Sequence, residues 1–404
     1  MKFSEELEWR GFINQTTYPD ISTLDGEPIS LYFGVDPSAH GMQIGNLAAA
    51  MMVRRFADQG HKVFLLVGGA TGMIGDPDGK LDERNLKSLD DIAKNKAEIA
   101  RQYSELFAGK PITIVDNYDW FKDINYLDFL REVGKNVPVS QMLGRDFIQT
   151  RLGEGGTGIS YAEFSYALIQ AYDFLHLRRE HGVSLQLCGA DQWGNSIAGV
   201  DLIRRIDGGE AHVLSQPLVM NASTGRKFGK SEEGAVWLDP KQTSVYKFFQ
   251  FWLNVDDIGV ESYLKVYTLL AREEIETLVA SHLENPGLRL AQKKLAEEVT
   301  ALVHGREAME SVKRVTAVLF GGDEFASLST DDLDALAREI PVVAIGKTIV
   351  ESLVEAGVAA SNGEAKRLLS GGGVSINGQK ITDDQPIDSA SLLKKGKNSF
   401  ILVR

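Results

Sequence analysis

"LYFGVDPSAHGMQIGNL", residues 31–47, contains the junction that decides the fold. Its β-branched and aromatic start predicts a strand over 29–35, and an Asp-Pro pair then turns the chain. A helix is expected over 44–60, ending at a glycine. Free N–H groups and the positive end of a helix dipole both suit phosphate, and Gly45 would let a flat ligand approach closely. Taken alone, this stretch could equally be an ordinary strand–helix turn.

The first half of the chain alternates strand and helix signals. Further strands are expected over 61–69, 111–117 and 184–189, and a helix over 88–109 with Ser88 as its N-cap. This alternation predicts a parallel, doubly wound sheet that binds ligands at the carboxyl ends of its strands. From about residue 245 the pattern is helical, and 321–346 reads as a connection. The tail from Lys347 predicts two helices and a hairpin with an Asn-Gly turn.

Size and charge narrow the class of protein. A chain of 404 residues is long enough for two or three domains, and 43% hydrophobic and 25% charged residues are ordinary for a globular protein. No apolar run has membrane-spanning length, the first residues do not resemble a signal peptide, and the single cysteine fits a reducing cytoplasm. The net charge of −13 argues against nucleic-acid binding by the whole chain. From Pro341 onward, however, eight basic residues face six acidic ones, which indicates a polyanionic partner or simply a solvated tail.

Two familiar site types are excluded. The stretch "GGATGMIGDPDGK" (68–80) is not a phosphate loop, because only three residues separate Gly75 from Gly79 and Leu81 stands where Ser or Thr is required. Its glycines at 69, 72 and 75 do not form a dinucleotide-binding fingerprint either. No two of the seven histidines lie four residues apart, so we expect no helical metal site.

Two further segments carry candidate binding residues. In "EFSYALIQAYDF" (163–174), Tyr166, Gln170 and Asp173 share one helix face. Burying a phenol, an amide and a carboxylate requires partners, so this face is either a polar pocket or a solvated surface. In "GRKFGKSEEG" (225–234), Lys227 and Lys230 could neutralise a polyphosphate. A solvated charged loop is the alternative there.

In this order, the segments resemble the class I aminoacyl-tRNA synthetases, and within them the tyrosyl-tRNA synthetases of bacterial type. The resemblance covers nearly the whole chain. Its motifs, several of them specific to the tyrosyl branch, are "YFGVDPSA", "VGGATGMIGDPDGK", "NYDWF", "FLREVGK", "EFSYALIQAYDFL", "GADQWGN", "KFGKS", "VWLDP" and "FFQFWLN". A tryptophanyl or other class I synthetase is the second hypothesis, disfavoured because Tyr32 and Asp173 suit a phenol better than an indole.

The resemblance implies a tyrosine site and an ATP site. The phenol of tyrosine would meet Tyr32 and Asp173, and phenylalanine would leave that carboxylate unpaired. The other tyrosine-site positions are Asp76, Tyr166 and Gln170 around the α-ammonium, and Gln192 near the carboxylate and α-phosphate. The implied ATP-binding positions are Gly34, Asp36, Gly45, Asn46, Asp191, Lys230 and Ser231. The implied catalytic positions are Ser38, Gln43, Lys80, Arg84, Lys227 and Lys230.

The implied reaction uses ATP as substrate, with Mg²⁺ accompanying ATP and no metal held by protein ligands. The chain departs from the family at Gln43-Ile44-Gly45-Asn46, where His-Ile-Gly-His is usual. The first histidine normally donates to the γ-phosphate, and the Gln43 amide can still donate with a different reach. Because the lysine loop and the Ser38 hydroxyl are kept, we expect catalysis to continue, and His40 is a candidate to compensate.

The resemblance also implies how the chain is divided. A Rossmann-like catalytic domain is expected over 1–220, a lysine loop with an α-helical domain that binds the anticodon arm over 221–330, and a small α+β, S4-like RNA-binding domain over 341–404. In the S4-like tail, Lys366 and Arg367 would contact tRNA(Tyr). Family resemblance further implies a cytoplasmic homodimer. A third hypothesis, suggested by Gln43, is an RNA-binding protein that derives from a synthetase and has lost catalysis.

Overall fold

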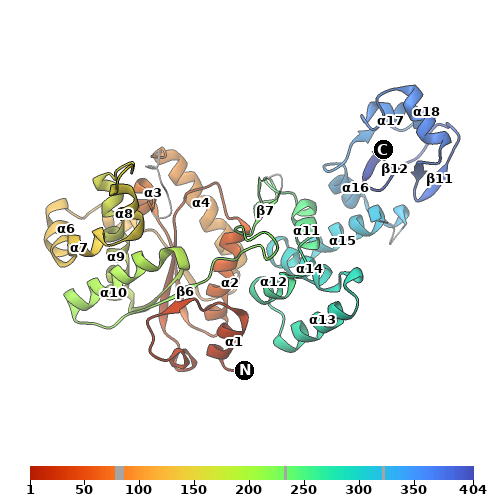
Figure 1. The fold of residues 1–404 in the computed structure, drawn as a ribbon. Coiled ribbons are helices and arrows are strands. Elements are labelled where there is room, and N and C mark those ends of the chain that lie inside the picture. Colours follow the sequence, from red (N-terminus) through yellow and green to blue (C-terminus); the bar gives the residue numbers. More distant parts are fainter. Residues whose placement is uncertain (78–85, 232–233, 321–323) are drawn as a thin grey trace. The chain divides into compact units, whose positions relative to one another are not determined.

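The computed structural model describes residues 1–77, 86–231, 234–320 and 324–404 (Figure 1). The side chains of residues 146, 147, 230 and 231 lie outside this description. The chain divides into two compact units, one of Met1–Thr243 with Asn254–Leu295 and one of Ser244–Leu253 with Ala296–Arg404. Within the described ranges, no helix has the length and apolar character needed to cross a membrane.

A six-stranded sheet forms the centre of the first unit, in the order β1-β6-β5-β2-β3-β4. Its strands are β1 (Gln15–Thr16), β2 (Ser30–Val35), β3 (Lys62–Val67), β4 (Ile112–Val115), β5 (Val183–Gly189) and β6 (His212–Gln216). Only β1 runs antiparallel to its neighbour, so the predicted parallel sheet is confirmed. The register places Tyr32 between Phe64 and Gln186 on neighbouring strands, and the three side chains therefore share one face.

Helices cover both faces of this sheet. In Figure 1, α2 (Ile44–Asp58) and α4 (Leu89–Leu106) lie on one face, and α9 (Tyr161–His181) and α10 (Trp193–Asp207) on the other. Right-handed crossover connections require this arrangement. From β2 the chain continues to β3 and β4 toward one edge of the sheet, and from β5 it continues to β6 toward the other edge, so the connecting helices lie on opposite faces. The helices predicted over 44–60 and 88–109 are confirmed, and Ser88 caps α4 by accepting the Asp91 N–H at 3.1 Å.

Smaller elements complete the first unit. Its other helices are α1 (Phe3–Arg10), α3 (Gly69–Ile74), α5 (Tyr118–Phe121), α6 (Tyr126–Glu132), α7 (Val139–Leu143), α8 (Asp146–Leu152), α12 (Val260–Tyr267) and α13 (Arg272–Glu284). The strands β7 (Lys230–Ser231) and β8 (Gly234–Ala235) pair with each other. Helix α14 (Leu290–His304) runs from the first unit into the second.

The second unit combines helices with a small sheet. Its helices are α11 (Val245–Leu253), α15 (Arg306–Phe320), α16 (Thr330–Leu336), α17 (Ile349–Glu355) and α18 (Asn362–Ser370). The sheet order is β11-β10-β12-β13-β9, with β9 (Val342–Val343), β10 (Val374–Ile376), β11 (Gln379–Ile381), β12 (Ser391–Lys395) and β13 (Ser399–Val403). The predicted hairpin joins β10 to β11 through Asn377 (φ 46°) and Gly378 (φ 84°), both left-handed as this turn requires.

One apolar cluster joins the small sheet to the helices before it. Val315 and Leu319 of α15 pack with Leu336 of α16 and with Leu392 and Phe400 of the sheet. Because the cluster is buried, the C-terminal sheet and α15 are held together by packing as well as by the chain.

Candidate active site

A cavity of about 50 Å³ lies beside the turn between β2 and α2. Its described lining residues are Asp36, Ser38, Gly72, Met73, Ile74, Gly75, Leu86 and Lys87. At the start of α2, the Asn46 Oδ1 atom accepts the Gln43 N–H at 2.9 Å, so the Asn46 NH₂ group remains able to donate elsewhere. Gly45 is exposed, and a Cβ added there would meet open space. Gly45 therefore leaves room for a ligand to approach the start of the helix closely, where the sequence predicts an anion.

The described part of the lysine segment, residues 225–231, lies against this same helix end. Gly229 has φ 100°, and a Cβ added to it would lie 3.2 Å from the Cβ of Ile44. The Ile44 N–H donates to the Val236 carbonyl at 3.1 Å, and Val236 in turn donates to the Gly229 carbonyl at 3.0 Å. Backbone pairing thus holds the segment beside the start of α2.

The predicted cations are placed only in part. The Lys227 side chain is exposed, and its backbone pairs with Met220. For Lys230 and Ser231 the backbone belongs to β7, but their side chains lie outside the described residues. Lys80 and Arg84 lie wholly outside the described residues.

Helix α9 carries the predicted polar residues on the face toward the sheet. Ser160 caps the helix by accepting the Glu163 N–H, and Tyr166 and Asp173 are buried while Gln170 is half-buried. The alternative of a fully solvated face is therefore wrong, because the Tyr166 phenol and the Asp173 carboxylate are buried.

Asp173 is 2% exposed and accepts two hydrogen bonds. The Trp120 Nε1–H donates to its Oδ1 at 3.0 Å, and the Asn117 Nδ2–H donates to its Oδ2 at 3.1 Å. Burial raises the pKa of Asp173 well above its usual value, and these two donors only partly oppose that rise. The structure thus fixes both carboxylate oxygens in an apolar setting.

The Tyr32 hydroxyl lies in the same buried region. Tyr32 is 1% exposed, its ring packs 5.2 Å from that of Phe174, and its Oη atom has no hydrogen-bond partner among the residues that the structure describes. Burial, and next the charge of Asp173, raise the pKa of Tyr32 well above its usual value. An unpaired buried hydroxyl is unfavourable, and a ligand hydroxyl placed between Tyr32 and Asp173 would satisfy it.

Further carboxylates surround Tyr166. Its hydroxyl donates to Asp36 Oδ2 at 2.7 Å, while Gln192 donates to Asp76 and Asn195 lies 3.5 Å from the other oxygen of Asp76. Burial, and next the charges of Asp36 and Asp76, raise the pKa of Tyr166 well above its usual value. This concentration of negative charge suits a small cation such as an ammonium group.

Gly34 and Asp191 complete the predicted set. Both are exposed. Gly34 lies near the end of β2, and Asp191 follows the end of the neighbouring strand β5. Asp191 folds back over Gly189, where an added Cβ would lie 2.5 Å from its Oδ1. Polar groups at the ends of adjacent parallel strands are where this class of sheet binds nucleotides.

Three contributors were not singled out from the sequence. Asn117 and Trp120 fix the Asp173 carboxylate, and Asn195 supports Asp76. The motif "NYDWF" contains the first two, but their spacing alone does not show which helix they face. A donor pair next to a predicted buried acid is the signal that could have identified them.

The predicted RNA-binding residues Lys366 and Arg367 are exposed on α18. Several other basic residues of the tail make contacts within the unit: Lys347 with Glu355, Lys394 with the Leu319 carbonyl, Lys395 with the Val358 carbonyl and Arg404 with Asp334. The basic excess predicted from the tail is therefore partly used within the fold.

Comparison with protein families matches the chain in two parts. The model for class I tRNA synthetases (W and Y) matches residues 24–321, and the model for the SYY-like C-terminal domain of tyrosine–tRNA ligase matches residues 332–404.

Individual proteins agree with this match. The tyrosine–tRNA ligase of Bacteroides fragilis is 43% identical over 428 aligned positions, which cover 100% of this chain and 99% of that protein. A C-terminally truncated mitochondrial tyrosyl-tRNA synthetase of Aspergillus nidulans has a TM-score of 0.72 and 30% identity, and the match covers 79% of this chain and 94% of that one. A tryptophanyl-tRNA synthetase of Encephalitozoon cuniculi, with a TM-score of 0.56, 14% identity and coverage of 82% and 91%, shares the fold alone.

Proposed function

The chain belongs to the tyrosine–tRNA ligases among the class I tRNA synthetases, and from that premise we propose that it activates L-tyrosine with ATP and transfers it to tRNA(Tyr). Tyrosyl-adenylate and pyrophosphate are the products of the first step. The ribose hydroxyl at the 3′ end of the tRNA then attacks the tyrosyl carbonyl, and AMP leaves.

The observation that carries this proposal is the buried hydroxyl of Tyr32 beside the buried carboxylate of Asp173. A tyrosine phenol would donate to Asp173 and accept from Tyr32, so both buried groups would gain partners. Phenylalanine would supply neither bond. An indole N–H could donate to the acid but could not accept from Tyr32, so this pair favours tyrosine over tryptophan.

The rest of the amino acid would lie toward Asp76. Tyr166, Gln170 and Asp76 would surround the α-ammonium, where the carboxylates favour positive charge. Gln192, which contacts Asp76, would reach the tyrosine carboxylate and the α-phosphate. The reacting carboxylate would then lie next to the nucleotide, and holding the two substrates together supplies much of the rate enhancement.

ATP would bind at the strand ends and the start of α2. Gly34, Asp36 and Asp191 would contact the nucleoside, and Gly45 and Asn46 would contact it from the helix end. As the tyrosine carboxylate attacks the α-phosphorus, charge builds on the leaving pyrophosphate. The groups that stabilise this charge would be the cations of Lys80, Arg84, Lys227 and Lys230 and the hydrogen-bond donors of Ser38 and Gln43, with Mg²⁺ entering as part of the ATP substrate. Lys230 and Ser231 would also bind ATP.

For tRNA, we propose that the three sequence segments divide the work. Residues 1–220 would bind tyrosine and ATP, 221–330 would supply the lysine loop and contact the anticodon arm, and 341–404 would bind RNA through Lys366 and Arg367. The exposure of these two residues supports the last role, because phosphate contact requires accessible cations. Activity in the cytoplasm is proposed with it, and cell fractionation tests that location.

A homodimer is also proposed, formed through an exposed apolar surface on the first unit. Tyr126, Leu127, Val139, Leu152 and Tyr161 are each at least half exposed and come from α6 to α9, which Figure 1 shows grouped together. Such surfaces commonly mark interfaces between proteins. Sedimentation should give a dimer for the wild type and a monomer for Tyr161→Glu, and a wild-type monomer would contradict this part of the proposal.

Amino-acid-dependent ATP–pyrophosphate exchange tests the activity itself. We expect exchange with tyrosine alone among the standard amino acids. Exchange with tryptophan would instead support a tryptophanyl enzyme. The absence of any exchange together with retained tRNA binding would support an RNA-binding protein without catalysis, which the Gln43 replacement motivates.

A further inference from the structure

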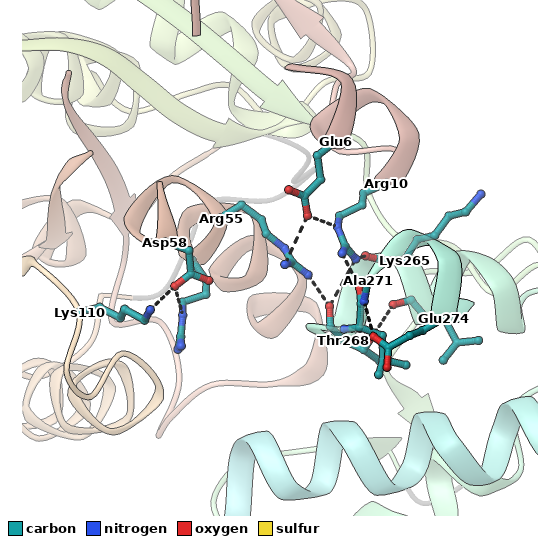
Figure 2. Close-up of polar contacts among 12 residues, drawn as sticks. Glu6, Arg10, Arg55, Asp58, Lys110, Lys265, Thr268, Ala271 and Glu274 are labelled. Atoms are coloured by element: carbon teal, nitrogen blue, oxygen red, sulfur yellow. Dashed lines mark hydrogen bonds and ion pairs between the residues drawn. The ribbon is translucent and has the colours of Figure 1, made fainter. Parts of the chain in front are cut away.

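Two buried arginines, one from α1 and one from α2, lie together in the first unit (Figure 2). Arg10 of α1 is 3% exposed and Arg55 of α2 is 8% exposed. Both contact Glu6, Arg10 Nε at 2.7 Å and Arg55 Nη1 at 3.4 Å from the same carboxylate oxygen. Two guanidinium groups thus share one carboxylate.

Other donors of the two guanidinium groups reach the carboxyl end of α12. Arg10 donates to the Lys265 carbonyl at 2.7 Å and to the Leu270 carbonyl at 2.7 Å. Arg10 and Arg55 both donate to the Thr268 carbonyl, as Figure 2 shows. The last carbonyls of a helix have no partner within it, so these arginines satisfy the end of α12 and attach it to α1 and α2.

The lysine segment rests on this same helix. Phe228, which lies between Lys227 and Lys230, is 8% exposed and stacks on Tyr263 with ring centroids 4.1 Å apart and planes 22° apart. Tyr263 also accepts the Ala222 N–H at 3.2 Å, just before the lysine segment. Helix α12 therefore supports the segment that carries the two lysines, because Tyr263 of α12 packs against Phe228 and bonds to Ala222. We call this support the seat of the segment.

The contacts form a closed path through the unit. Arg55 lies near the carboxyl end of α2 and attaches α12, α12 seats Phe228, and Gly229 packs against Ile44 at the amino end of α2. A displacement of α12 would move Phe228, and with it the lysines, relative to the helix end proposed to bind phosphate.

Stability alone does not explain the arginine pair. A buried ion pair can often be replaced by apolar residues at little or no cost in stability, and here one carboxylate serves two cations. Burial, and next the charge of Arg10, lower the pKa of Arg55 to about 10, which shows how unfavourable its charge is at this place. What apolar residues could not provide is several N–H donors in a fixed geometry that orient a helix end.

We propose that Arg10 and Arg55 are positioning residues for tyrosine activation, which fix α12 so that Phe228 seats the lysine segment opposite the start of α2. This inference rests on the proposed function. It adds that cations lying outside the substrate sites control how well the pyrophosphate side of the reaction is neutralised.

The test compares Arg55→Met with Arg54→Met. Arg54 is the matched control, because it precedes Arg55 on α2 and donates to the Leu106 carbonyl at 2.9 Å, at the end of α4 instead of α12. In pyrophosphate exchange we expect Arg55→Met to lower kcat by roughly 10- to 100-fold with an unchanged KM for tyrosine, because misplaced groups cost rates of this order. Arg55→Lys should restore part of the loss, and Arg54→Met should match the wild type.

Coupling to Phe228 provides a second measurement. If Arg55 acts through Phe228, the double variant Arg55→Met/Phe228→Leu should be about as slow as the slower single variant, whereas independent effects would multiply. Multiplying effects, or a normal kcat in a folded Arg55→Met protein, would overturn the proposal. Arg55→Lys and Phe228→Leu keep the test possible if Arg55→Met does not fold.

Limited trypsin digestion gives a readout that does not depend on activity. Cleavage after Lys227 should be at least severalfold faster in folded Arg55→Met than in the wild type and Arg54→Met, because the segment loses its seat. Equal cleavage rates would contradict the inference. If the wild type shows no exchange but Arg55→Met is still cleaved faster than the wild type and Arg54→Met, the proposed function is rejected. The inference that Arg55 positions the segment would then still hold.

Discussion

Replacing Asp173 with Asn tests the proposed recognition of the tyrosine phenol most directly. The amide has nearly the same size as the carboxylate, but it has one acceptor oxygen where Asp173 offers two to Trp120 and Asn117. Both donors cannot then be satisfied as they are in the wild type. The acceptor available to the phenol is also neutral, and no longer a buried charge.

The expected loss follows from these contacts. A hydrogen bond to a charged group contributes about 1.5–3 kcal/mol, and a buried hydroxyl left unpaired costs about 1–3 kcal/mol more. Together they correspond to about 2.5–6 kcal/mol, or roughly 10²- to 10⁴-fold in kcat/KM for tyrosine. Activation of phenylalanine, which has no phenol, should change much less.

Pyrophosphate exchange with tyrosine and with phenylalanine measures this difference in one protein. The preference of the wild type for tyrosine should fall by most of that factor in Asp173→Asn, and circular dichroism should report an unchanged fold. An unchanged preference would refute the reasoning, because the acid would then not contact the substrate hydroxyl.

The same variant has a defined pH signature. Burial raises the pKa of Asp173 in the folded protein. At a pH between the unfolded and the folded pKa, the carboxyl group is therefore protonated in the folded state and ionised in the unfolded state. The stability of the wild type relative to the variant should therefore fall as pH rises above about 4. Thermal unfolding of both proteins from pH 4 to 8 measures the sign, and an opposite slope would contradict the assigned burial.

Three other predictions concern Gln43, the tail residues Lys366 and Arg367, and Asp332 of the second unit. Gln43→His should raise the rate of tyrosine activation in pyrophosphate exchange, and a lower rate would mean that the site has adapted to glutamine. Lys366→Ala combined with Arg367→Ala should weaken tRNA binding and reduce its salt slope by roughly 1.4–1.8, since each phosphate contact contributes about 0.7–0.9; an unchanged slope in filter binding would exclude these contacts. Burial by itself would raise the pKa of Asp332, but hydrogen bonds led by that of Arg314 lower it to about 2. Wild-type stability should therefore exceed that of Asp332→Asn by about 1–2 kcal/mol above pH 4 and lose this advantage as pH falls toward 2, as acid unfolding curves would show.

Local patterns in the sequence determined most of the architecture. Alternating apolar strands and amphipathic helices predicted the parallel sheet, and Asn377-Gly378 predicted the hairpin that joins β10 and β11. The spacing of Tyr166, Gln170 and Asp173 likewise placed three polar groups together on α9. These features depend on periods of two or 3.6 residues and on turn preferences, which the sequence displays directly. The strands β1, β6, β7, β8, β9, β12 and β13 were not anticipated.

The tertiary structure alone decided the contacts that make the site specific. Trp120 and Asn117 meet Asp173 across more than 50 residues of chain, and Arg55 meets the end of α12 across more than 200. Local periodicity shows which face of a helix is polar but not which distant donor will lie opposite it. The partners are determined by the sheet order, which brings β4, α9 and β2 together, and by burial, because a buried polar group is unfavourable unless it is hydrogen-bonded.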